Sequence, residues 1–149
     1  MSDLRPIGAS PFLYGDQPNG FGARFEYNEK NGQVVGKVTI DSAKEGPPKH
    51  AHGGSLATLI DEAMGACCWV NGHKVLAANL NINFKQPVPL NMEIIVIGEV
   101  DHVDGRKIHT KGHIMLPDGT ISTEGTGLFI VAPEIFEGQD YNPFETTVK

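Results

Sequence analysis

The chain has 149 residues, of which 40% are hydrophobic and 20% charged, and its formal net charge is −6. This length suits one domain with a sizeable core, and the composition is that of folded globular proteins. We therefore expect a single domain over residues 1–149. The negative charge offers no basic surface to a phosphate backbone, so nucleic acid is not an expected partner.

The sequence also bears on membranes and redox compartment. The amino terminus has no apolar stretch typical of a signal peptide, and no apolar run approaches the roughly 18 to 20 residues that a membrane span needs. Cys67 and Cys68 are adjacent, and a bond between neighbours would be strained and close no useful loop. We expect reduced thiols packed in a helix, no membrane span, and a cytoplasmic location.

The first half of the chain is expected to begin with an irregular arm over residues 1–20, which is rich in Gly, Pro and Asn. Two strands follow over residues 22–29 and 33–42, joined by a turn at Asn31 and Gly32. The next segment, EGPPKHAHGG, is a connecting loop, because prolines lack the backbone donor that regular elements use.

A single long helix is predicted over residues 54–70, where apolar side chains recur at helical spacing. Four strand-like segments follow, over residues 75–86, 92–103, 106–116 and 120–132, and residues 133–149 read as an acidic surface extension. A lone long helix needs a broad sheet to cover it. The prediction is an α+β domain in which a curved antiparallel sheet of six strands wraps around one central helix.

The start of this helix carries the first chemical signal, His52-Gly53-Gly54. The first N–H groups of a helix have no partner within it, and glycine lets another group approach the backbone closely. Such N–H groups favour negative charge. They would stabilise the oxyanion that forms when water attacks a thioester carbonyl, so the amides of Gly53 and Gly54 are candidate oxyanion donors.

The helix also offers two neighbouring carboxylates, Asp61 and Glu62. Asp61 lies on the same face of the helix as several small residues, which suggests close contact with another backbone. Burial there should raise its pKa toward values useful to a general base. Glu62 is expected to be the solvated or capping neighbour. On these residues alone, a surface role for Asp61 beside a like charge stays an equal alternative.

The segment HGGSLATLIDEAMG resembles the signature of the hotdog thioesterase superfamily, in which an acid follows nine residues after the histidine, as Asp61 follows His52. The segments ANLNINFKQPVPL, DGRK and EGTGLFI add a resemblance to its acyl-CoA thioesterase branch, which includes PaaI-like proteins and mammalian thioesterase superfamily members. This implies a hotdog fold whose sheets join edge to edge in a homodimer, or further in a dimer of dimers, with active sites at the interface.

The resemblance assigns roles residue by residue. It implies hydrolysis of acyl-CoA with no separate cofactor, Asp61 as general base or nucleophile, Gly53 or Gly54 as oxyanion donor, and His52 shaping the turn. Coenzyme A carries several phosphates, which require cations. The residues that the resemblance places at coenzyme A or its reacting end are Asn79, Asn83, Lys85, Arg106 and Lys107.

The chain departs from the family pattern at two positions. Ala77 stands where the most similar members have a threonine that holds the water, and Gly46 stands near a position where others have asparagine. His50, Asn79 or a backbone group would have to position the water instead. The alternative that Ala77 keeps open is a non-catalytic acyl-CoA binding or sensing protein with the same fold.

Other chemistries are less well supported. A hydratase-type site resembles an aspartate followed five residues later by a histidine, but residue 66 is alanine. A metal site at His50 and His52 would lack further ligands nearby. Ser55 lacks the surroundings of a nucleophilic serine and is read as a hydroxyl at the helix start.

Overall fold

The structure is a computed structural model that describes residues 3–17, 19–139 and 142–144. Within these residues, seven strands and one long helix dominate, with three short helical turns in the connections. In chain order the elements are β1 (Leu4–Ile7), α1 (Pro11–Tyr14), β2 (Arg24–Asn28), β3 (Val34–Thr39), η1 (Ser42–Lys44), α2 (Gly53–Val70), β4 (Val75–Phe84), β5 (Glu93–Asp104), β6 (Lys107–Met115), β7 (Ile121–Val131) and η2 (Pro133–Phe136).

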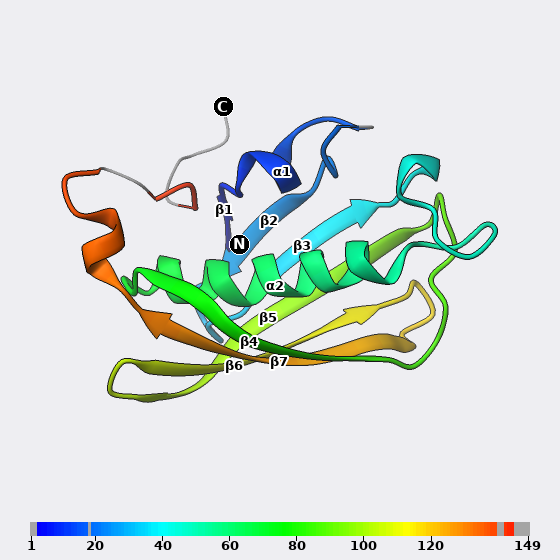
Figure 1. The fold of residues 1–149 in the computed structure, drawn as a ribbon. Helices are drawn as coiled ribbons and strands as arrows, with labels where there is room; N and C mark the ends of the chain where they lie inside the picture. Colours follow the sequence, from blue (N-terminus) through cyan, green and yellow to red (C-terminus); the bar gives the residue numbers. More distant parts are fainter. Residues whose placement is uncertain (1–2, 18, 140–141, 145–149) are drawn as a thin grey trace.

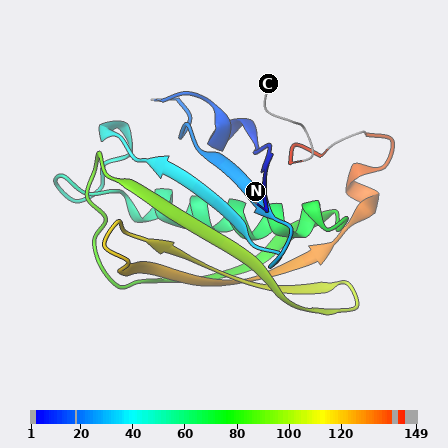
Figure 2. The same ribbon diagram turned by 180° about the vertical axis from the view of Figure 1, so that it is seen from behind.

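The strands form one sheet in the order β1-β2-β3-β5-β6-β7-β4, with every neighbouring pair antiparallel. The sheet curves around α2, which lies along its concave face (Figures 1 and 2). The predicted architecture of a curved sheet around one helix is therefore confirmed. Within the described residues, no helix is long and apolar enough to cross a membrane.

The predicted strand number was wrong, since the sheet has seven strands rather than six. The additional strand, β1, lies within residues 1–20, which were expected to be irregular. It pairs with β2 and buries Ile7. Pro6 is tolerated there because an edge strand leaves one side of its backbone unpaired. Four residues containing a proline are too few to show strand periodicity.

The core lies between α2 and the concave face of the sheet. Its helix side includes Leu59, Ile60, Ala63 and Met64, all fully buried. Gly98 on β5 permits the close approach, since a Cβ there would lie 2.5 Å from the carbonyl carbon of Ala63. The sheet is thus drawn against the middle of α2.

The two cysteines are free and buried in α2, as predicted. Burial raises the pKa of the Cys67 thiol to about 11 and that of Cys68 to about 12. The Sγ of Cys67 donates to the carbonyl of Gly32 at 3.0 Å. Both thiols are therefore protonated packing groups near neutral pH.

Part of the carboxyl-terminal segment packs inward, which corrects the expectation of a surface extension. Phe144 is 6% exposed, and its ring lies 6.5 Å from that of Trp69 on α2. Phe136 contacts Trp69 edge to face at 4.9 Å. The N–H of Gly8 donates to the carbonyl of Phe144 at 3.0 Å, which joins the two terminal segments. Residues 140–141 and 145–149 of the predicted tail lie outside the described residues.

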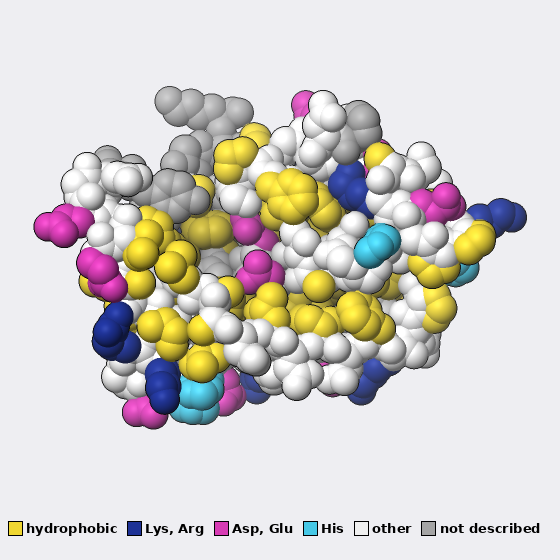
Figure 3. All heavy atoms as spheres, viewed as in Figure 1, with side chains coloured by type: hydrophobic (Ala, Val, Ile, Leu, Met, Phe, Trp, Pro, Cys, Tyr) yellow, Lys and Arg dark blue, Asp and Glu magenta, His cyan; other side chains and the backbone are white. Residues whose placement is uncertain are grey.

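Strand β4 forms one edge of the sheet and leaves apolar side chains exposed: Leu76 at 43%, Leu80 at 38% and Phe84 at 55%. Its register against β7 shifts between Ala77 and Asn79, so that Ala78 is an extra residue. In Figure 3, hydrophobic side chains run along this face beside α2. An edge strand with unpaired backbone and apolar side chains is a template for another chain.

Candidate active site

The start of α2 is held by His52, its N-cap residue. The Nδ1 atom of His52 accepts a hydrogen bond from the N–H of Gly54 at 2.9 Å. The N–H groups of Ser55 and Leu56 point to the carbonyl of His52. Among the described residues, the N–H of Gly53 has no hydrogen-bond partner. Of the two predicted oxyanion donors, Gly53 is the one whose amide is available.

The surroundings of His52 require a glycine at position 46, whereas position 53 has room for a small side chain. A Cβ at Gly46 would lie 2.7 Å from the Cα of His52, so the loop leaves no room for the asparagine found there in other members. A Cβ at Gly53 would lie 3.4 Å from Cζ of Phe84, the last residue of β4. The exposed end of β4 thus adjoins the free amide.

Asp61 lies two turns further along α2, half-buried in a cavity of about 250 Å³. Its other walls include Gly65 on α2 and Ala77 on β4. No hydrogen bond or ion pair to the carboxylate of Asp61 occurs among the described residues. Burial raises the pKa of its carboxyl above 3.8, which agrees with the expected direction. An unpaired carboxylate in a cavity is poised to accept a proton or attack a carbonyl.

Glu62 is not the solvated neighbour that the sequence suggested. Its Oε2 accepts a hydrogen bond of 2.6 Å from the backbone N–H of Ser10, in the amino-terminal arm. Burial is the main cause that raises the pKa of Glu62, and the hydrogen bonds from Ser10 oppose it. The prediction failed because the arm covers this side of α2, and nothing in the helix pattern reports what a distant segment covers.

The predicted coenzyme A contacts lie in two groups. Asn79 and Asn83 pair with Leu128 and Glu124 on the face of the sheet opposite α2, and the Nζ of Lys85 lies 2.9 Å from Glu124. Arg106 is in the turn after β5, where its guanidinium donates to the carbonyl of Val131 at 2.9 Å.

These groups lie at opposite ends of β7. The backbone of Lys85 bonds to Ser122 near its start, whereas Lys107 pairs with Ile130 near its end. Eight residues of strand span about 26 Å. One chain therefore does not bring Lys85 together with Arg106 and Lys107.

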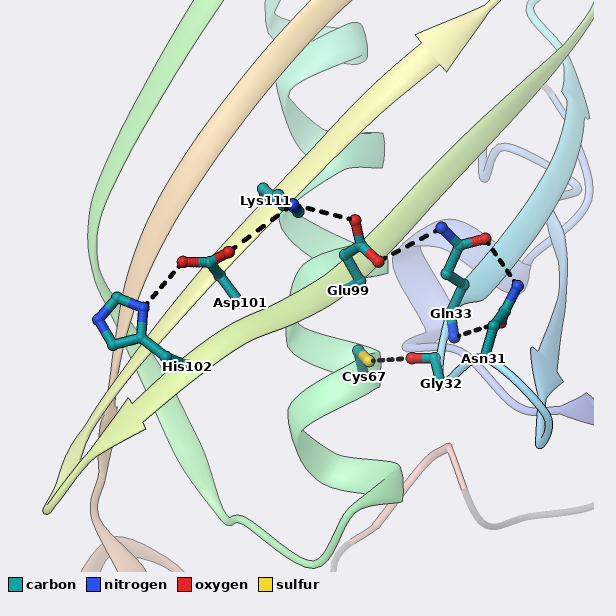
Figure 4. A network of polar contacts seen from close by, with 8 residues as sticks. All are labelled: Asn31, Gly32, Gln33, Cys67, Glu99, Asp101, His102 and Lys111. Carbon is teal, nitrogen blue, oxygen red and sulfur yellow. Dashed lines mark hydrogen bonds and ion pairs between the residues drawn. The ribbon is translucent and has the colours of Figure 1, made fainter.

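The outer face of the sheet carries a separate polar network (Figure 4). Lys111 lies between Glu99 at 3.6 Å and Asp101 at 3.7 Å, and His102 contacts Asp101 at 2.8 Å. The ring of His102 stacks on that of His109, with centroids 4.3 Å apart. These charges pair with one another on the side of the sheet away from α2.

Of the two side chains proposed to hold water in place of the missing threonine, His50 contacts another group and Asn79 faces away from Asp61. Ala77 does face the Asp61 cavity, so the hydroxyl is absent where the resemblance places it. Asn79 follows the bulge and points to the opposite face, where it lines a depression with His102 and His109. The Nδ1 of His50 lies 2.9 Å from the carbonyl oxygen of Pro48.

Comparison with known proteins identifies the family. A family model described as the thioesterase superfamily matches residues 48–123, which include α2 and Asp61. The chain belongs to the thioesterase superfamily.

Among curated relatives, the acyl-coenzyme A thioesterase THEM4 of Bos taurus is 44% identical over 87 residues, covering 58% of this chain and 35% of that protein. THEM4 of Xenopus laevis is 36% identical over 105 residues, covering 70% and 47%. The chain spans less than half of the length of either relative.

Solved structures agree with the fold. A crystal structure of a thioesterase superfamily protein superposes with a TM-score of 0.69 at 35% identity, covering 72% of this chain and 53% of that one. A hypothetical thioesterase from Streptococcus pneumoniae, solved with coenzyme A, gives 0.65 at 22% identity, covering 68% and 80%. The domain has the hotdog fold that the sequence resemblance implied.

Proposed function

We propose that the protein hydrolyses acyl-CoA to a free acid and coenzyme A, with Asp61 as general base or nucleophile and the Gly53 amide as oxyanion donor. The observation that carries the proposal is the half-buried, unpaired carboxylate of Asp61 in a cavity beside β4. Membership of the thioesterase superfamily supports it, as does the activity in the names of the THEM4 relatives.

The proposed site needs two copies of the chain. Gly53 and Asp61 are eight residues apart on one helix, which is about 12 Å along its axis. A carbonyl being attacked must lie about 3 Å from both its oxyanion donor and its base. The Gly53 amide of one copy therefore serves the Asp61 of another.

Strand β4 supplies the means of pairing. Its Gly53 end is marked by Phe84 and its Asp61 end by Ala77, and the exposed Leu80 lies between them. Two copies paired antiparallel through β4, about a twofold axis near Leu80, place the Gly53 end of one against the Asp61 end of the other. We propose this homodimer as the active form.

The same pairing explains the separated cations. Lys85, just beyond one end of β4, approaches Arg106 and Lys107 of the second copy, which lie beside the other end of β4 across β7. Together they form the cationic cluster that the phosphates of coenzyme A require. Lys85 must exchange its contact with Glu124 for a phosphate, which an exposed pair does at little cost.

The alternative function is binding of acyl-CoA without efficient hydrolysis, and Ala77 is the observation that favours it. With no hydroxyl opposite Asp61, the attacking water has one anchor fewer. The two functions share a cleft and differ in turnover. Both predict that free coenzyme A raises the melting temperature.

A thiol-release assay on a panel of acyl-CoA substrates tests the proposal. Asp61→Asn should lower kcat by at least about 10²-fold, because a positioned general base contributes about that much or more. Asp16→Asn, at an exposed position in the arm, is the matched control. Full activity in Asp61→Asn would refute the assignment. Stabilisation by coenzyme A without thiol release would favour the binding protein.

A further inference from the structure

Glu62 has no part in the proposed chemistry, yet it is half-buried beside Asp61. Its carboxylate holds the backbone of Ser10, a residue 52 positions earlier in the chain, at 2.6 Å. Keeping a carboxylate away from water is unfavourable unless it is well hydrogen-bonded. The contact fixes the amino-terminal arm at the point where it passes from β1 to α1 (Figure 1).

The arm and the carboxyl-terminal segment both contribute to the wall of the Asp61 cavity. Ser10 forms one part of the wall, and Trp69, Phe136 and Phe144 form an aromatic part. The bond from Gly8 to Phe144 ties the arm to that aromatic wall. The volume of about 250 Å³ is smaller than the roughly 300 to 1,000 Å³ of pockets for drug-sized ligands.

The direction of the acyl group follows from this shape. Lys85, one of the cations that suit coenzyme A, contacts Glu124 on the outer side of the β4 edge, whereas the aromatic wall lies on the α2 side. A thioester whose carbonyl rests at Asp61 therefore directs its acyl group into the aromatic cavity. The position of the arm then limits how long that group can be.

We propose that Glu62 is a specificity-determining positioning residue, which fastens the arm through Ser10 and so restricts the site to short acyl or compact aryl groups. The inference rests on the proposed function. It extends that function by naming the substrate class and the residue that sets it. Glu62 acts through the arm and does not touch the reacting atoms.

Ser10 permits a test that leaves Glu62 in place. The hydrogen bond comes from its backbone N–H, and its φ of −62° is one that proline adopts. Ser10→Pro removes both the backbone N–H and the hydroxyl that donate to Glu62 while keeping that angle, and Ser10→Ala, which loses only the hydroxyl, is the matched comparison that retains the backbone donor. Glu62→Ala removes the acceptor, Glu62→Gln keeps a neutral one, and Glu93→Ala deletes an exposed carboxylate elsewhere, on β5.

The experiment measures kcat/KM for acetyl-, hexanoyl-, decanoyl-, palmitoyl- and phenylacetyl-CoA. The wild type should prefer the short and aryl substrates. In Glu62→Ala and Ser10→Pro, the ratio of long-chain to short-chain kcat/KM should rise on the order of tenfold, the effect of one hydrogen bond to a charged group, mainly through a lower KM for long chains. Ser10→Ala and Glu62→Gln should lie nearer the wild type, and Glu93→Ala should match it.

The ratio between substrates separates specificity from stability, because partial unfolding lowers every rate by the same factor. If Glu62→Ala does not fold, Ser10→Pro carries the test. Equal ratios in the wild type and in folded Ser10→Pro and Glu62→Ala would overturn the role of Glu62, as would a wild-type preference for palmitoyl-CoA. A wild type that releases thiol from no substrate would instead overturn the proposed function.

Discussion

Replacing Gly53 by proline tests the oxyanion assignment with little disturbance of the helix. Gly53 is the first residue of α2, the position where proline is well tolerated because its missing N–H has no partner within the helix. His52, with φ −65° and ψ 137°, already has the extended conformation favoured before proline. The substitution deletes the proposed oxyanion donor and leaves the Gly54 bond to His52 in place.

The expected loss follows from the role of the amide. Removing one oxyanion-hole donor lowers kcat by about 10² to 10³-fold. Gly53→Ala keeps the amide and places its Cβ 3.4 Å from Phe84, an acceptable contact, so its loss should be small. Single-turnover thiol release, with melting curves to confirm folding, measures both. Equal activity of the proline and alanine variants would refute the assignment.

Mixing two inactive variants tests whether the site is shared between copies. In a dimer of one Gly53→Pro chain and one Asp61→Asn chain, one interface site has both functional groups and the other has neither. Random exchange of equal amounts makes half of the dimers mixed, so activity should return to about one quarter of the wild type. A site within a single chain predicts no recovery, and that result would refute the interface arrangement.

Three further predictions concern the pH dependence of stability, the assembly of the chain and the packing of its core. Burial raises the pKa of Asp61 in the folded state, so the wild type loses free energy of unfolding as the pH rises from 3.8 through that raised value. Asp61→Asn does not ionise and should therefore have a higher melting temperature than the wild type at pH 7. The difference in melting temperature should disappear below pH 3.8. Leu80→Lys should give monomers by light scattering with strongly reduced activity, while Val103→Lys, at another exposed apolar position, should remain dimeric. Gly98→Ala, which drives a Cβ to 2.5 Å from the backbone of Ala63, should lower the free energy of unfolding by at least about 1 to 3 kcal/mol in urea titration.

The sequence predicted those parts of the fold whose signal is local. The helix was expected over residues 54–70 and runs over Gly53–Val70, because its apolar side chains repeat at helical spacing over five turns. The four strands after it are nine to twelve residues long, and buried and more exposed side chains alternate along β6 and along the first half of β5. Strand β1 and the inward packing of Phe144 have no such repeat, since both depend on segments distant in the chain.

The candidate site likewise has one part that the sequence predicts and another part that it does not. The spacing from His52 to Asp61 is a property of one helix and could be read directly. Two other features depend on side-chain positions that no residue pattern specifies. The N–H of Gly54 is unavailable as an oxyanion donor because it bonds to His52, and Glu62 holds the backbone of Ser10. The aromatic residues of the tail could have predicted the cavity wall, because phenylalanine side chains are rarely left in solvent and an acidic surface extension does not bury them.

The bulge at Ala78 has a consequence for how β4 can change length. Before the bulge, the odd-numbered residues Val75 and Ala77 face α2. After it, the even-numbered residues Leu80 and Phe84 do, because Ala78 is an extra residue that shifts the alternation by one. Deleting a single residue well away from the bulge, between Leu80 and Phe84, would reverse the faces of the residues on one side of the deletion. Deleting either of the two adjacent alanines, which leaves the same sequence in both cases, would join two segments already in phase and restore a regular ladder. This alanine pair is the place within β4 at which the chain can lose a residue and keep its pattern of inward and outward side chains.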